Sequence, residues 1–408
     1  MALDPEQFRQ KRIQRQKQRQ AAQKRLQMRL LLAFFALVGC AVIILLATRS
    51  ASPSQPGDAG APAQTAPAGE ITTIRIAAVG DVNITDRVVN SATSVQEYNN
   101  MLMDVSHLLA DPHLTLMNLE GVVSGPPYGG SRSTPPELLQ ALKKAGVDGV
   151  QLANSYTIHG GISSLATTVA AVEAHGLLPL GTYKNDGKDK PYTIINVQGV
   201  RVALIAFTKG TVGMGMLSNG RYGTNILYTD YDTTYQKVDT ERINRILSDV
   251  RSEKPDLTIA MLHWGSEFND NISTSQKKIR TLLEEGGVDA ILGTHSHYVQ
   301  KMELDAQGRF IAYSLGDFLG DGTRAGSEYS VILNLTVEKN NKTGNTVIKS
   351  FDYVPTFIVN EENQPLRVLR LKEAMAAYEA GHIDRVSQTT YEAMKYALTR
   401  VEARVAGK

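Results

Sequence analysis

Short apolar runs alternate with amphipathic segments along most of the chain after residue 70. The runs are rich in Ile, Val and Leu and predict strands at residues 73–80, 114–118, 149–153, 192–197, 201–207, 257–262 and 290–293. The segments between them carry apolar residues at helical spacing and predict helices at residues 135–145, 163–175, 236–252 and 274–286. Gly146, Gly176 and Gly287 stand where helices commonly end in a left-handed residue. Strands that alternate with helices in this way predict an α/β fold.

Beyond His297 the pattern changes to a strand-rich portion that is followed by two helices. The strands are predicted at residues 310–314, 329–337 and 345–353. The helices are predicted at residues 368–379 and 384–405. We therefore expect one domain over residues 71–371 and a C-terminal helical tail over residues 372–408.

An uncharged and mostly apolar run of 18 residues occupies residues 30–47. A helix of this length is ~27 Å long, which is close to the ~30 Å hydrocarbon thickness of a bilayer. Nine basic residues precede the run and only Arg49 closely follows it. The positive-inside rule then places residues 1–29 in the cytoplasm and the domain outside the cell. We expect a single-pass anchor in the cell membrane; the alternative is a cleaved signal peptide, whose apolar part is usually about 7–15 residues long.

The segment after the apolar run, residues 48–70, is rich in Ala, Pro, Gly and Ser and predicts a flexible linker. Charge is uneven along the chain. Residues 1–49 contain ten Lys or Arg but only Asp4 and Glu6, whereas the remainder contains 33 basic and 39 acidic side chains. A net negative domain argues against nucleic acid as a partner. The single cysteine, Cys40, lies in the apolar run, so the domain has no disulfide.

Side chains that bind metals or transfer protons stand where four of the predicted strands end. They are Asp81, Asn118, Glu120, His263, His295 and His297. Strand carboxyl ends are where α/β proteins build their sites, so we expect these side chains to converge. Residues two apart on an extended strand point the same way, so both imidazoles of His295 and His297 could reach one ion. Carboxylate, amide and imidazole ligands together suit Mn, Fe or Zn.

Six segments occur in an order that resembles the CapA family of bacterial capsule and poly-γ-glutamate synthesis proteins. They are Val79-Gly-Asp81-Val-Asn, Met117-Asn-Leu-Glu120, Leu152-Ala-Asn154, His263-Trp-Gly-Ser-Glu267, Gly293-Thr-His-Ser-His-Tyr-Val-Gln300 and Ala312-Tyr-Ser-Leu-Gly-Asp-Phe318. The resemblance spans about residues 74–371. CapA-like domains are similar to calcineurin-like metallophosphoesterases. The resemblance therefore implies a four-layer α/β/β/α sandwich, in which two facing mixed sheets are flanked by helices, behind the N-terminal transmembrane helix.

The turn after the third predicted strand departs from the family pattern. The family usually has Asn-Asn-His there, where this chain has Asn154, Ser155 and Tyr156. In the wider phosphoesterase fold, this turn supplies an amide ligand and a histidine that helps to protonate the leaving group. A second departure is Asp317, which stands where the family often has Asn and would be either an added ligand or part of a capped turn.

The resemblance also suggests roles around the predicted metal site. Tyr156 or His159 would have to replace the missing acid, and Glu267 is a further candidate catalytic residue. The candidate substrate contacts are Arg87, Asn154, Trp264 and Asp317.

Two functions remain open at this stage. The first is a membrane-anchored extracellular hydrolase or transferase with one or two divalent transition-metal ions, Mn, Fe or Zn. It would act in the synthesis, export or attachment of an anionic capsule polymer such as poly-γ-glutamate. The alternative is a non-catalytic scaffold or binding subunit with a degenerate site, with or without metal. In either function its partners would be the membrane subunits of polymer synthesis and the polymer or cell-wall material.

Overall fold

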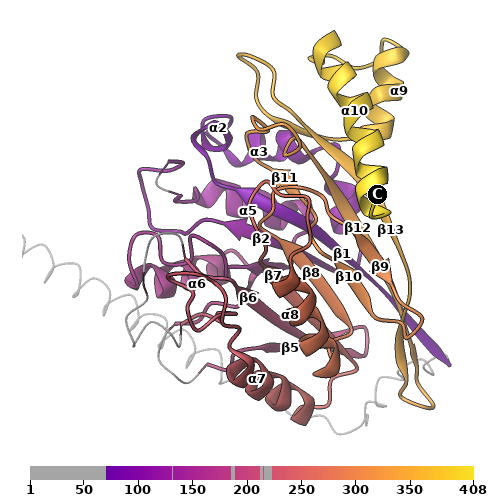
Figure 1. Ribbon diagram of the computed structural model, residues 1–408. Coiled ribbons are helices and arrows are strands. Elements are labelled where there is room, and N and C mark those ends of the chain that lie inside the picture. The colour runs from indigo at the N-terminus through magenta and orange to yellow at the C-terminus, as the bar shows by residue number, and fades with distance from the viewer. Residues whose placement is uncertain (1–69, 131, 185–188, 212–214, 216–222) are drawn as a thin grey trace, which may run out of the picture. The chain divides into compact units, whose positions relative to one another are not determined.

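The computed structural model describes residues 70–408, apart from residues 131, 185–188, 212–214 and 216–222 (Figure 1). The predicted cytoplasmic segment at residues 1–29, the predicted transmembrane helix at residues 30–47 and nearly all of the predicted linker lie outside the described residues. Within the described part, none of the helices is both long enough and apolar enough to cross a bilayer.

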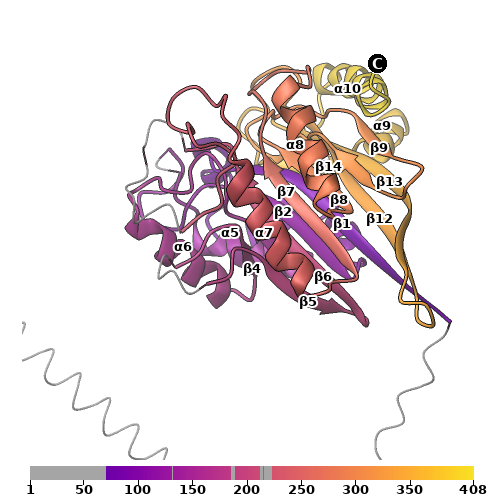
Figure 2. The same cartoon turned by 60° about the horizontal axis from the view of Figure 1, so that its bottom comes forward.

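Two mixed β-sheets face each other (Figures 1 and 2). The first runs in the order β14 (Arg367–Arg370), β13 (Thr346–Val359), β12 (Tyr329–Asn340), β1 (Ile71–Asn83), β2 (Leu114–Glu120), β3 (Gly149–Gln151) and β4 (Leu178–Leu180), and β11 (Asp317–Leu319) pairs with β1. The second runs in the order β5 (Thr193–Val197), β6 (Val200–Thr208), β7 (Leu257–His263), β8 (Ala290–Thr294), β10 (Phe310–Ala312) and β9 (Met302–Leu304). The predicted α/β class is therefore confirmed.

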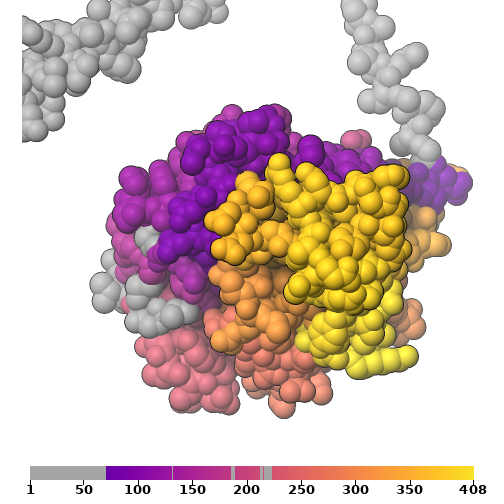
Figure 3. Space-filling view, turned by 90° about the horizontal axis from the view of Figure 1, so that it is seen from above, coloured from indigo at the N-terminus to yellow at the C-terminus, as the bar shows by residue number. Residues whose placement is uncertain are grey.

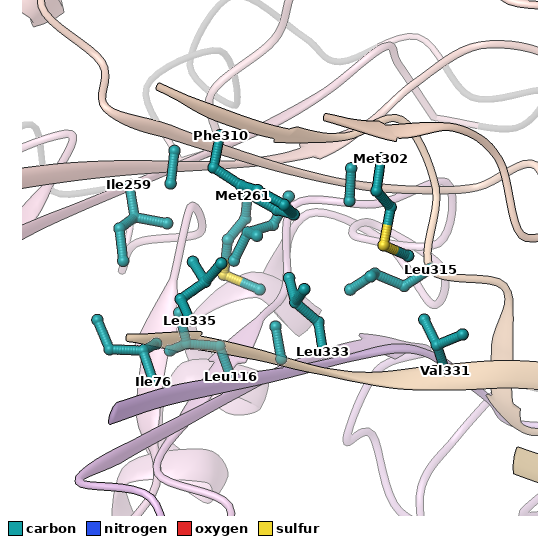
Figure 4. Packing of buried hydrophobic residues seen from close by; sticks show 14 of the residues in the cluster. Ile76, Leu116, Ile259, Met261, Met302, Phe310, Leu315, Val331, Leu333 and Leu335 are labelled. Atoms are coloured by element: carbon teal, nitrogen blue, oxygen red, sulfur yellow. The ribbon is translucent and has the colours of Figure 1, made fainter. Parts of the chain in front are cut away.

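The space between the sheets is filled by a central apolar core. Side chains alternate across a strand, so Ile74, Ile76 and Ala78 of β1 all face this core. Figure 4 shows Ile76, Leu116 and Leu335 of the first sheet directed toward Ile259 and Met261 of the second. Burial of this apolar surface from both sheets holds the two layers together.

Helices cover the outer face of each sheet. The helices that pack on the first sheet are α2 (Asp86–Val89), α3 (Val95–Leu102), α4 (Ser106–Ala110), α5 (Pro136–Ala145) and α6 (Ser163–Ala174). Those that pack on the second sheet are α7 (Thr240–Ser252) and α8 (Thr274–Glu285), as Figure 2 shows. Helices, two sheets and helices therefore form four successive layers.

Two C-terminal helices, α9 (Leu371–Glu379) and α10 (Gln388–Val405), lie against β12 and β13. Met394, Ala397 and Val401 lie on one face of α10 and are buried in the central core. The two helices cover much of the face seen in Figure 3. Residues 372–408, which the sequence suggested as a tail, thus pack on the same core as the two sheets.

The end of α5 illustrates how local sequence determines an element boundary. Gly146 caps this helix in the left-handed conformation, with φ of 110°. A Cβ on Gly146 would also lie 2.5 Å from the Cα of Ala110, so a side chain there is excluded twice. Gly176 and Gly287 have positive φ values as well, which confirms the conformation predicted at all three positions.

Candidate metal centre

The predicted ligands come together where the carboxyl ends of both sheets meet. Strand register places Asp81 of β1 beside Asn118 of β2 and beside Asp317 of β11. In the second sheet, His263 at the end of β7 lies beside Thr294 at the end of β8. All of the ligand-type residues are buried, with less than 5% of each residue exposed, and they are Asp81, Asn118, Glu120, His263, His295, His297 and Asp317.

Two glycines allow the backbones to approach closely enough to assemble this centre. A Cβ on Gly80 would lie 1.8 Å from the carbonyl oxygen of Gly316, and one on Gly293 would lie 2.0 Å from that of Tyr313. The backbone N–H of Asp81 donates a hydrogen bond to the carbonyl of Gly316 at 2.9 Å. Only glycine permits these contacts, and they fix the backbone at Asp81 and just before His295.

One group of candidate ligands consists of Glu120, His263 and His295. One ligand atom from each lies within 4.8 Å of the others. His263 Nε2 is 3.6 Å from Glu120 Oε1, and the His263 and His295 ring centroids are 4.4 Å apart. Ser155 Oγ lies 3.0 Å from His263 Nε2 and so contacts the same imidazole edge.

The second group consists of Asp81, His297 and Asp317, again with one ligand atom from each within 4.8 Å of the others. His297 Nδ1 lies 2.7 Å from Asp317 Oδ1 and 3.9 Å from Asp81 Oδ2. The two groups adjoin each other, because His297 Nδ1 is also 3.9 Å from Glu120 Oε2. Asp317, predicted as a substrate contact, therefore lies among the candidate ligands.

The expectation that His295 and His297 share one ion is not supported. Strand β8 ends at Thr294, and the two histidines have positive φ values of 89° and 59°. The alternation of an extended strand does not apply to such a backbone. The ring centroids are 6.3 Å apart, and each imidazole belongs to a different group.

Burial controls the protonation of this centre. Burial raises the pKa of Glu120 to about 8 and that of Asp81 to about 6, although the nearby His297 opposes both shifts. Burial also lowers the pKa of His263 and His295 well below the usual range. These imidazoles are therefore neutral, which is the form that binds metal ions.

His297 differs from the other two histidines. Burial alone would lower its pKa, but Asp317, Glu120 and Asp81 outweigh burial and hold the pKa well above the usual range. The three buried carboxylates therefore favour a positive charge among them, which protonated His297 or a bound divalent cation would supply.

The donor atoms of the centre fit a divalent metal ion. Among the described residues, the buried atoms Glu120 Oε2 and His295 Nδ1 have no hydrogen-bond partner. Buried polar atoms are normally satisfied, so unpaired ones at the centre of a ligand cluster indicate a missing partner. Carboxylates and imidazoles are ligands of Mn, Fe and Zn.

Two amide side chains support the centre. Asn118 Nδ2 donates a hydrogen bond to Asp81 Oδ1, and Asn118 Oδ1 accepts one from Asn154 Nδ2 at 3.3 Å. Asn154 also donates to the carbonyl of Leu119 at 2.6 Å, and its Oδ1 accepts from the backbone N–H of Tyr156 at 3.0 Å. Asn154 therefore positions Asn118 and the Tyr156 turn, which does not support the predicted contact with substrate.

The side chains of two further predicted substrate contacts make hydrogen bonds within the protein. Trp264 is completely buried in the layer under α7 and α8, where its indole N–H donates to the carbonyl of Tyr313 at 2.9 Å. Arg87 donates to Asn360 Oδ1 at 2.8 Å and to the carbonyl of Gln364 at 2.6 Å. Both side chains thus have structural partners, which do not support substrate binding.

The predicted catalytic residues of the altered turn lie next to an arginine that sequence reasoning missed. The ring of Tyr156 is half-buried, and the centroid of the His159 ring is 5.9 Å away. Arg132 Cζ lies 4.2 Å from the Tyr156 ring centroid, and one Arg132 nitrogen donates to Asn83 Oδ1 at 2.6 Å. Arg132 belongs to a loop and stands 12 residues after the end of β2 in the sequence, so the strand-end rule gives no signal for it.

A cavity of about 300 Å³ opens beside the first group of ligands. Its lining residues are Ser155, Lys209, Gly210, Tyr235, Ser266, Glu267 and His295. Glu267, predicted as catalytic, therefore borders the centre. Lys209 was missed, although it stands two residues after the strand predicted at residues 201–207 and directly after β6, so the strand-end rule could have found it.

The fold and the site define a class of protein: an α/β/β/α sandwich with a buried, two-part candidate metal centre at the strand ends. Comparison with protein families assigns this chain more closely. It belongs to the family described as bacterial capsule synthesis protein PGA_cap, whose model matches residues 75–322. The predicted relationship to capsule synthesis proteins is confirmed.

Relatives of known name agree with this assignment. The chain is 29% identical over 189 residues to the capsule biosynthesis protein CapA of Bacillus anthracis, which covers 46% of this chain and 44% of the relative. It is 23% identical over 241 residues to the PGA biosynthesis protein CapA of Bacillus subtilis (strain 168), with 59% and 58% covered. The chain thus spans about half the length of the curated relatives it matches.

Solved structures with similar arrangements include a calcineurin-like phosphoesterase, YfkN, from Bacillus subtilis. It is 16% identical to this chain with a TM-score of 0.39, and the match covers 80% of this chain and 99% of that one. A phosphatase from Mycoplasma pneumoniae is 12% identical with a TM-score of 0.44, covering 70% and 94%.

Proposed function

We propose that this protein is a membrane-anchored, extracellular capsule synthesis protein that acts on an anionic polymer of the poly-γ-glutamate type. It would act by metal-assisted hydrolysis or transfer, next to the membrane subunits that make or export the polymer. Membership of the capsule synthesis family and the names of the relatives support the polymer class. The observation that carries the catalytic proposal is a pair of buried ligand atoms, Glu120 Oε2 and His295 Nδ1, that have no hydrogen-bond partner among the described residues.

Two groups of candidate ligands would hold a divalent transition metal, Mn, Fe or Zn. Glu120, His263 and His295 would hold it in one group, and Asp81, His297 and Asp317 in the other. A divalent cation there would act as a Lewis acid toward a carbonyl or phosphoryl oxygen of the substrate. Asn118 would fix the orientation of Asp81 through its hydrogen bond.

Tyr156 is the side chain that would supply a proton to the leaving group. Burial raises the pKa of its hydroxyl above the ordinary value. The hydroxyl therefore keeps its proton at neutral pH and can donate it. Arg132, which lies over the Tyr156 ring, would hold the ring in place.

A second candidate function is a binding subunit that does not turn substrate over. The observation that favours it is the turn at Asn154, Ser155 and Tyr156, in which the amide is used internally and no imidazole is present. Loss of a general acid typically lowers the rate by about 10²- to 10⁴-fold.

Metal analysis and an assay of polymer length separate these functions. The full chain would be purified in mild detergent without chelators, and its metal content measured beside that of Glu120→Gln and of the exposed control Glu285→Gln. Bound metal together with shortening of poly-γ-glutamate supports the hydrolase, and bound metal without shortening or transfer supports the binding subunit. A wild-type chain that binds no divalent metal would overturn the metal centre.

The proposed location needs its own test. Residues 30–47 would anchor the chain, so the full chain should be found in the membrane fraction and a chain without residues 1–47 should not. Protease added to intact cells should digest the domain from outside. Recovery of the full chain in the soluble cytoplasmic fraction would contradict the proposal.

A further inference from the structure

The cavity beside Glu120, His263 and His295 carries two opposite charges that do not neutralise each other. Lys209 and Glu267 both line it, yet the described residues include no ion pair within 4.0 Å between them. Burial lowers the pKa of Lys209 and Glu267 opposes this shift, so the two groups are within electrostatic range. A cation and a carboxylate held apart on one cavity wall match a ligand with the opposite pair of charges.

Lys209 is fixed in place but keeps donors for a ligand. Its backbone N–H donates to the carbonyl of His263 at 2.8 Å, which ties it to the end of β7. Its ammonium group donates to the carbonyl of Gly265 at 2.8 Å and lies 4.6 Å from the Tyr235 ring centroid. An ammonium group has three donors, so further hydrogen bonds can be made to a carboxylate in the cavity.

Glu267 supplies the negative charge. Its side chain is exposed, and its carboxylate makes no hydrogen bond or ion pair with another described residue. A rim carboxylate that has no partner in the described part of the chain is open to a ligand ammonium group. The volume, about 300 Å³, is at the lower end of small-molecule pockets, which range from ~300 to 1,000 Å³. The cavity therefore suits one residue of a polymer.

We infer that this cavity binds the amino-terminal residue of a γ-linked glutamyl chain, with Lys209 on its α-carboxylate and Glu267 on its α-ammonium group. The inference rests on the proposed function for the polymer class. In a γ-linked chain only the amino-terminal residue carries both free groups on one carbon. Inner residues carry a carboxylate and an amide, and the last residue carries two carboxylates. Ser155 and His295 on the cavity wall place the metal centre next to the bound end.

Calorimetric binding to the full chain in detergent tests this inference, with the same MnCl₂ concentration in cell and syringe. The probes are γ-glutamyl-glutamate and its N-acetyl derivative. The acetylated peptide should bind about 10- to 100-fold more weakly, since a hydrogen bond to a charged group contributes that range. Glu267→Gln should weaken only the free peptide and remove the discrimination, whereas Lys209→Met should weaken both peptides.

Two exposed positions on α8 provide matched controls, Lys277→Met and Glu285→Gln. They should bind as the wild type does, and thermal unfolding by circular dichroism checks that every variant is folded. Equal affinity for the two peptides, no binding of either, or discrimination that survives Glu267→Gln would each overturn the inference. Tighter binding of free glutamate than of the dipeptide would assign the cavity to the amino acid instead.

Failure of this inference can be told apart from failure of the proposed function. Poly-γ-glutamate with acetylated amino ends would be compared with free polymer in the length assay. Equal shortening of both would overturn recognition of the amino end and leave the hydrolase intact. Faster shortening of the free polymer supports recognition of the amino end. If neither polymer is shortened, turnover is contradicted, but the binding results still stand.

Discussion

Hydrogen bonds from neighbouring groups hold the Asp81 carboxylate in one orientation. Asn118 and the backbone N–H of His295 donate to its two carboxylate oxygens, and Asn154 in turn holds Asn118. We expect Asn154→Ala to weaken Mn²⁺ binding about 10- to 100-fold, the usual cost of losing a residue that orients a ligand. Metal titration checks this, with the exposed Gln307→Ala as the control. Unchanged affinity would show that Asn154 does not act through Asn118.

The close contact at Gly80 predicts that no larger residue fits at this position. A Cβ at this position would lie 1.8 Å from the Gly316 carbonyl oxygen, which belongs to a backbone that cannot easily move. We expect Gly80→Ala to lower the free energy of unfolding by more than about 3 kcal/mol, a range reserved for severe packing faults. Urea unfolding measures this. Gly199→Ala is the control: Gly199 has a φ of 88° but no atom near its added Cβ, so it should lose only about 1–3 kcal/mol.

The site residues that could be predicted from the sequence are those that stand at strand ends. Asp81, Glu120 and His263 are placed by strands whose pattern is visible in the sequence, and the structure brings them together. The contact of Ser155 with His263 and that of Arg132 with Tyr156 were not predicted, because both depend on how separate loops fold over the site.

At the scale of elements, long helices and strands are easier to predict from the sequence than short ones. The long strands and helices, such as β7 and α8, show a clear apolar period and lie within a few residues of their predicted bounds. Strands β4, β9 and β11 have three residues each and were not predicted, because so short a segment shows no clear period; the equally short β3 and β10 were predicted because apolar residues extend beyond them in the sequence. The turn after β8 was misjudged because positive φ at His295 and His297 leaves no mark in the sequence.

The junction between α8 and β8 makes stability depend on pH. Asp289 accepts a hydrogen bond from the backbone N–H of Thr258 at 2.7 Å, and burial raises its pKa to about 6. An unfolded chain loses this proton near pH 4, so the folded state binds more protons between about pH 4 and pH 6. The contribution of Asp289 to the free energy of unfolding therefore falls as pH rises through this window.

Asp289→Asn removes this loss and keeps an oxygen acceptor for Thr258. Relative to wild type, the variant should gain about 2 kcal/mol in free energy of unfolding between about pH 4 and pH 7, with some reduction by solvent screening. Urea unfolding across this range measures the gain. The exposed Asp249→Asn should show no such trend, and a constant difference for Asp289→Asn would contradict the argument.

At the scale of the whole molecule, the central core joins the two sheets and α10. Met394 of α10 is completely buried in this core, whereas Tyr396, two residues on, is 60% exposed. We expect Met394→Ala to cost about 2–5 kcal/mol of unfolding free energy, as for other buried methionines. Tyr396→Ala should change it by less than about 0.5 kcal/mol. Equal effects in chemical unfolding would show that α10 does not contribute to the core.

The participation of α10 in the core also bears on how the protein is made. Ile74 of β1, at the start of the domain, and Val405, at the end of α10, belong to the same apolar cluster. A nascent chain cannot complete that cluster until its final helix has left the ribosome. Until α10 has emerged, the polypeptide therefore cannot close its apolar interior, and the two sheets alone leave part of that cluster uncovered.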